Sequence, residues 1–116
     1  MPANQKKRFA RGRAILNRLP SAPELMTLPE LEFYTGASLR AIRGWVQEWI
    51  AEGFIGQTKI GYQVAGPGSP WQVNRKPLIA WVIARKYVRF PPEYGFPSTE
   101  AAEDMLGALK GKVKNT

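Results

Sequence analysis

The sequence contains no cysteine and no histidine among its 116 residues. Without cysteine the chain can form neither a disulfide framework nor a thiolate nucleophile. Without histidine it lacks the commonest general base, the Ser/His/Asp triad and a usual zinc ligand. These absences exclude the most frequent catalytic arrangements, so we expect a protein that is not an enzyme and that uses no cofactor and no metal.

Long apolar runs are missing as well. No stretch approaches the roughly 18 consecutive apolar residues that a membrane-spanning helix needs. The basic start MPANQKKRFARGR leads into no apolar signal-peptide core. We therefore expect no membrane partner and a cytoplasmic location.

The chain is short and basic. Its 116 residues suit one domain, and a hydrophobic share of 44% is enough for a small core. It has 17 lysines and arginines against 9 acidic residues, which gives a formal net charge of +8. A small basic domain most often binds a polyanion.

The excess positive charge lies in two segments. Residues 1–18 hold six basic residues and no acidic residue, and residues 54–92 hold six more, again without an acidic one. A surface that serves only solubility would mix both signs. The first segment is therefore a candidate basic arm, although plain surface charge also explains such a segment.

Local signals predict two helices, over residues 28–35 and 39–52. A capping box and a serine cap mark their starts, and a glycine that can adopt the left-handed conformation follows each. The residues concerned are Thr27 with Glu30 and then Gly36 for the first helix, and Ser38 and Gly53 for the second.

Apolar and polar residues separate onto two faces of the second helix. The apolar sector, about 140° wide, holds Leu39, Ile42, Trp45, Val46, Trp49 and Ile50. The opposite sector, about 100° wide, holds Arg40, Arg43, Gly44 and Gln47. We expect the first sector, with Trp81 from further along the chain, to form the core. Gly44 costs about 1 kcal/mol relative to alanine inside a helix, so its presence invites a functional explanation.

The second half of the chain predicts a β-hairpin and two more helices. Apolar and polar residues alternate over 54–64 and 71–75, with turn residues at 65–70 between them. A helix is expected over 77–89, and a last helix with a narrow apolar stripe over 98–113.

This order of elements resembles the small MerR-like and excisionase-like winged helix-turn-helix proteins over roughly residues 26–89. The similar segments are TLPELEFYTGASLRAIRGWV, EGFI, KIGYQV with WQV, and PLIAWV. Within them, the residues at helix-turn-helix spacing are Leu31, Gly36, Ala37, Ser38, Ile42 and Trp45. The resemblance implies a mostly α fold with a small β-hairpin wing.

Together with the charge distribution and the prolines, the resemblance predicts three parts: a basic arm and proline-containing linker (1–26), a winged helix-turn-helix domain (27–90), and a linker with an extra C-terminal helix (91–116). It also implies a sequence-specific double-stranded DNA binder, nucleoid-associated, such as a small transcriptional regulator or an excisionase-like architectural factor of a phage or mobile element.

Three sets of residues are candidates for DNA contact. Arginine forks and glutamine amides match guanine and adenine edges in the major groove, a capped helix N-terminus can hold a phosphate, and a basic arm can enter the minor groove. The candidates are Ser38, Arg40, Arg43, Gly44 and Gln47 in the recognition helix (38–52); Gln57, Thr58, Lys59, Tyr62, Arg75 and Lys76 in the wing (54–75), on the backbone or minor groove; and Arg8, Arg11 and Arg13 in the arm.

Several alternatives stay open. The chain could be the DNA-recognition subunit of a viral packaging or replication complex, an RNA binder, or a winged-helix module for protein–protein interaction. Arg40 and Arg43 could pair with Glu30, Glu32 or Glu48, and Trp71 and Tyr62 could stack on an unpaired base. The stripe of residues 98–113 could form a homodimer or dock on its own domain.

Overall fold

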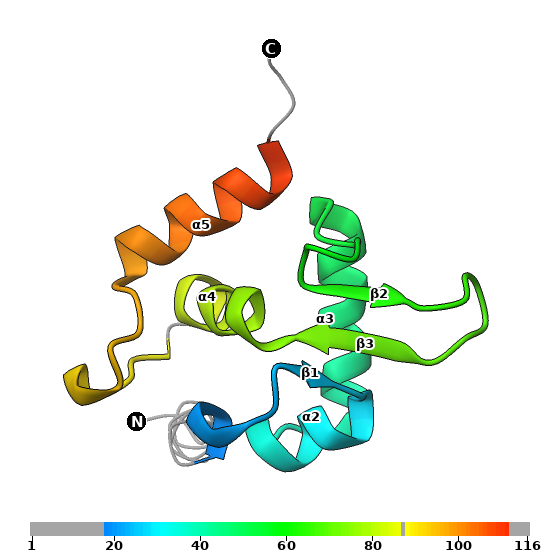
Figure 1. Cartoon of the computed structure of the whole chain (residues 1–116), viewed down its shortest axis with the longest axis horizontal. Helices are drawn as coiled ribbons and strands as arrows, with labels where there is room; N and C mark the ends of the chain where they lie inside the picture. The colour runs from blue at the N-terminus through cyan, green and yellow to red at the C-terminus, as the bar shows by residue number, and fades with distance from the viewer. Residues whose placement is uncertain (1–17, 87, 112–116) are drawn as a thin grey trace, which may run out of the picture.

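The computed structural model describes residues 18–86 and 88–111. Within these ranges the fold is mostly helical, with four α-helices and a small three-stranded antiparallel sheet (Figure 1), which confirms the expected balance of helix and strand. In chain order the elements are η1 (Leu19–Ser21), β1 (Leu25–Met26), α2 (Leu28–Thr35), α3 (Leu39–Glu52), β2 (Gly61–Gln63), β3 (Trp71–Asn74), α4 (Arg75–Arg85), η2 (Pro92–Tyr94) and α5 (Thr99–Gly111). The arm residues Arg8, Arg11 and Arg13 lie outside the described residues.

The bounds predicted for α2 and α3 are confirmed, because both helices are limited by local hydrogen bonds. The Thr27 amide donates to Glu30 Oε1 at 2.8 Å, and the Glu30 amide donates to Thr27 Oγ1 at 3.3 Å. The Ser38 Oγ accepts a hydrogen bond from the Ala41 amide at 3.1 Å. Left-handed glycines end the helices, Gly36 at φ 75° and Gly53 at φ 82°.

The sheet contains a strand that the sequence pattern did not predict. β3 pairs with β2 in the expected hairpin and, on its other edge, with β1, where Met26 lies opposite Val73. Leu19, Ala22 and Met26 are buried in the core. The interpretation of residues 19–26 as a linker is therefore wrong, because burial of these three side chains holds the segment on the domain.

The hairpin strands are shorter than expected. Residues 54–60 form a compact turn rather than part of a strand, since the Ile60 amide donates to the Phe54 carbonyl at 3.0 Å. Phe54 and Ile60 are both fully buried. Because both side chains are buried in the core, residues 54–60 do not place alternate side chains on opposite faces as a strand would.

α4 begins two residues before the predicted start and ends at Arg85 instead of residue 89. Every residue from Leu78 to Ala84 is buried, so the helix has no solvent face over two turns. Its Trp81 ring contacts Trp45 and Trp49 of α3, with ring centroids 5.4 and 5.6 Å apart. This cluster joins α3 to α4, as expected for a tryptophan core.

α5 lies along α4, on the opposite side of the molecule from the β2–β3 loop (Figure 1). Its Ala102 and Leu106 are buried, so the apolar stripe packs within the same chain. In the part of the chain that the structure describes, no helix is both long enough and apolar enough to cross a lipid bilayer.

Candidate nucleic-acid interface

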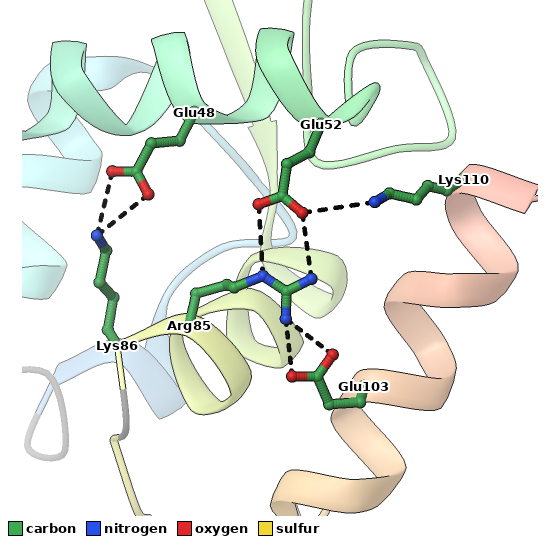
Figure 2. Close-up of polar contacts among 6 residues, drawn as sticks. All are labelled: Glu48, Glu52, Arg85, Lys86, Glu103 and Lys110. Atoms are coloured by element: carbon green, nitrogen blue, oxygen red, sulfur yellow. Dashed lines mark hydrogen bonds and ion pairs between the residues drawn. The ribbon is translucent and has the colours of Figure 1, made fainter.

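α3 presents three different surfaces. Ile42, Trp45, Val46 and Trp49 are buried. Arg40, Arg43, Gly44 and Gln47, which we call the α3 stripe, are all exposed. Glu48 and Glu52 point toward α4 and α5 (Figure 2). Ile50, expected in the apolar sector, is 48% exposed.

The acidic residues of α3 are bound by cations from neighbouring elements. Lys86 Nζ lies 3.1 Å from a Glu48 carboxylate oxygen. Arg85 lies 3.2 Å from Glu52 and also makes two 2.8 Å hydrogen bonds to Glu103 of α5. Lys110 reaches Glu52 at 3.5 Å (Figure 2). These contacts connect the C-terminal half of α3 to both α4 and α5.

Two residues of this cluster, Glu52 and Arg85, have shifted pKa values. The hydrogen bond from Arg85 lowers the pKa of Glu52 below its ordinary value of 4.5, against the smaller opposing effect of burial. The bonds to Glu52 and Glu103 raise the pKa of Arg85. Because the folded pKa of Glu52 is depressed, its contribution to stability is present above the unfolded pKa and is lost as pH falls through the folded pKa.

The arginines of the α3 stripe differ from Arg85 and Lys86, which pair with carboxylates. Within residues 18–86 and 88–110, neither Arg40 nor Arg43 forms an ion pair. The alternative that pairs them with Glu30, Glu32 or Glu48 is therefore wrong. Glu48 binds Lys86 instead, and Glu30 accepts a hydrogen bond from the Thr27 amide. Two guanidinium groups and an amide thus stand in solvent on one face of α3.

The candidate wing residues do not lie on the loop between β2 and β3. Gln57, Thr58 and Lys59 belong to the turn before β2, and Arg75 and Lys76 open α4. The loop itself is uncharged, since residues 60–74 contain no acidic or basic residue. Of the candidate wing residues only Tyr62 lies on a strand of the hairpin, β2, and the basic candidates come before and after the two strands.

Two of these cations have structural partners. Lys59 Nζ donates to the Gly53 carbonyl at 3.1 Å, where it caps the C-terminus of α3. Arg75 Nη1 donates to the Ala22 carbonyl at 2.9 Å and to the Pro20 carbonyl at 3.3 Å. These bonds fix the segment before β1 against α4, so Arg75 stabilises the fold.

Asn74 also has a role that the sequence did not suggest. Its side-chain amide donates to the Lys59 carbonyl at 2.6 Å and to the Gln57 carbonyl at 3.0 Å. It holds the turn before β2 in place.

Two separate grooves are lined by some of the candidate residues. The first, with a volume of about 480 Å³, lies between the N-terminus of α2, α3 and the start of β3, and includes Arg43, Gln47 and Trp71. The second, about 730 Å³, is lined by Gln57, Thr58, Tyr62, Arg75 and Lys76 together with Phe96 and Met105. The grooves share no lining residue.

We call them the α3 groove and the sheet groove. The structure brings Arg43 and Gln47 together with Trp71, and it separates all three from the candidate residues of the sheet groove. Pro29 and Pro70 also line the α3 groove, and no pattern in the sequence marks them. They meet there because the first turn of α2 and the first residues of β3 both pack beside α3.

The β2–β3 loop is shaped by its own hydrogen bonds. Ser69 Oγ donates to the Gly66 carbonyl at 2.7 Å and accepts from the Ala65 amide at 3.0 Å. Gln63 donates to the Ser69 carbonyl at 2.9 Å. The loop projects from the body of the molecule (Figure 1), and Val64 at its base is 65% exposed.

Searches against protein families, curated protein sequences and solved structures found no match for this chain.

Proposed function

We propose that this protein binds double-stranded DNA as a winged helix-turn-helix, with α3 in the major groove. The observation that carries the proposal is the α3 stripe: Arg40, Arg43 and Gln47 are exposed on one face of a capped helix, and the two arginines form no ion pair among the described residues. The acidic residues of the same helix are bound by Arg85, Lys86 and Lys110 instead.

Groove geometry explains why this arrangement suits DNA. The major groove is about 12 Å wide and admits an α-helix, and its base edges offer acceptor pairs to an arginine fork and an acceptor–donor pair to a glutamine amide. The proposed role is recognition rather than catalysis. The resemblance noted in the sequence narrows this proposal to a transcriptional regulator or excisionase-like factor acting at the nucleoid in the cytoplasm, with a packaging or replication subunit as the alternative.

Two further candidate cations, Lys59 and Arg75, hold backbone carbonyls. The proposal therefore assigns much of the phosphate contact to the basic arm, with Arg8, Arg11 and Arg13. Each phosphate contact steepens the salt dependence of binding by about 0.9 in log–log slope. Neutralising these three arginines in the full chain should flatten the slope by about 2–3.

The decisive experiment measures the affinity of the full chain for duplex DNA selected from a random pool, against salt. Arg43→Ala should weaken binding to the selected sequence by about 5- to 150-fold, the equivalent of one base contact worth about 1–3 kcal/mol. Arg89→Ala removes the same charge from an exposed position that lines neither groove and should change the affinity little. Equal affinities for the unmodified chain and an Arg40→Ala/Arg43→Ala double variant would contradict the proposal.

The selected sequences also test a homodimer through residues 98–113. A twofold-symmetric site indicates two subunits. Because Ala102 and Leu106 are buried in their own chain, such a dimer would have to use another face of α5. Asymmetric sites together with a monomer mass in sedimentation would count against it.

The uncharged β2–β3 loop supports a second candidate, a protein-interaction module. An exposed Val64 on a loop without charge suits an apolar protein contact better than a phosphate contact. The two functions separate by salt, since contact through several phosphates weakens steeply with ionic strength.

A further inference from the structure

The α3 groove has the size and chemistry of a ligand site. Its volume of about 480 Å³ lies within the range of small-molecule sites, roughly 300–1,000 Å³. Leu28, Pro29 and Val46 contribute apolar surface, and Arg43 and Gln47 contribute polar groups. Apolar walls with a few convergent polar groups are typical of a site that binds and orients a small ligand.

Trp71 differs from the other tryptophans of the chain. Trp45, Trp49 and Trp81 are buried in the core, whereas Trp71 is only half-buried and lines the α3 groove. An aromatic side chain open to a groove provides a surface for base stacking, which tolerates any base because every base has a π-face.

The charge of the groove favours a nucleic-acid ligand. Its lining includes a guanidinium and a side-chain amide and no carboxylate, whereas the sheet groove includes Glu24. Arg43 and Gln47 belong both to the groove and to the α3 stripe. A base displaced from a duplex that lies on the stripe would therefore meet the groove directly.

We propose that the α3 groove holds an unpaired base of the bound DNA, with the base against Trp71 and its edge at Arg43 and Gln47. This inference rests on the proposed function, because the stripe must face DNA. It implies a preference for duplexes with an unpaired base, where the cost of unstacking and unpairing is already met.

The test compares an intact duplex with one that carries a single unpaired 2-aminopurine, a fluorescent adenine analogue. The full chain should bind the second duplex more tightly, and stacking on Trp71 should change the 2-aminopurine emission. Trp71→Ala should remove both effects, with a loss of about 5- to 150-fold on the unpaired-base duplex. Trp71→Phe keeps an aromatic ring and should preserve most of the preference.

Tyr94→Ala is the matched control, because Tyr94 is an exposed aromatic residue that does not line the α3 groove, and it should leave the preference unchanged. Equal binding of both duplexes by the full chain, with unchanged 2-aminopurine emission, refutes base capture. If Arg43→Ala still weakens both duplexes in that case, the proposed function stands alone. Failure to bind either duplex refutes both proposals. The emission readout uses the unmodified chain, so the test holds even if Trp71→Ala does not fold.

Discussion

Replacing Gly44 with alanine should change stability and DNA affinity in opposite directions. Gly44 lies in the interior of α3, and a Cβ built there meets no atom within 4 Å. Because glycine inside a helix costs about 1 kcal/mol relative to alanine, the variant should be more stable by about that amount. For a domain of this size the gain corresponds to a rise in Tm of about 4 °C, measurable by circular dichroism.

The same methyl group should weaken DNA binding. Gly44 lies between Arg43 and Gln47 in the exposed stripe, and its missing side chain allows the backbone of α3 to approach the base edges. Displacing one base contact costs about 1–3 kcal/mol. We expect the lower end of that range for a single methyl group, which is about a fivefold loss of affinity, measured by fluorescence anisotropy on the selected duplex at fixed salt.

A matched control exists in α5. Gly107 is exposed within that helix, and its Cβ also meets nothing within 4 Å. Gly107→Ala should raise Tm by a similar amount and leave DNA affinity unchanged. If Gly44→Ala binds DNA as tightly as the unmodified chain, α3 does not approach DNA along this face. A fall in Tm would refute the helix argument itself.

Three further substitutions test the fold that positions the stripe. Arg85→Met should lower the free energy of unfolding by about 1 kcal/mol at neutral pH, the upper end for a partly exposed ion pair. In urea titrations at several pH values, the difference in unfolding free energy between variant and unmodified chain should narrow below pH 4.5, the ordinary pKa of the partner Glu52. A difference that does not change with pH would contradict this. Gly61→Ala places a Cβ 3.2 Å from the Trp49 ring and should cost about 1–3 kcal/mol, detected as a lower urea midpoint; an unchanged midpoint would show that the ring moves freely. Leu106→Ala removes a side chain that is 1% exposed and should lower the free energy of unfolding by about 2–5 kcal/mol. The DNA affinity of the folded variant should stay the same. A large loss of DNA affinity would place α5 in the interface.

Short-range signals in this chain predicted structure well. The capping box of Thr27 and Glu30 and the cap at Ser38 involve residues three apart, so the sequence places the partners together before any tertiary contact forms. The apolar spacing that buries Ile42 and Trp49 also left Arg40 and Arg43 outside, because helix periodicity fixes relative directions around one axis.

The predictions failed where the structure depends on contacts between residues far apart in the sequence. Strand β1 forms because residues 25–26 pair with the free edge of β3, about 50 residues later in the chain. A two-residue strand leaves no periodic pattern in the sequence. Arg75 looked like a DNA contact, but it binds the Ala22 carbonyl across 53 positions. Sequence spacing contains no information about which distant carbonyl a guanidinium will meet.

The sequence by itself determined the helices, the faces of α3 and the presence of a basic, mostly helical domain, since caps and periodicity act over a few residues. Only the tertiary structure decided which cations remain free and where the grooves lie. Those properties depend on the packing of α2, β3 and α4 around α3, which brings together residues such as Pro29, Gln47 and Trp71 that no local rule connects.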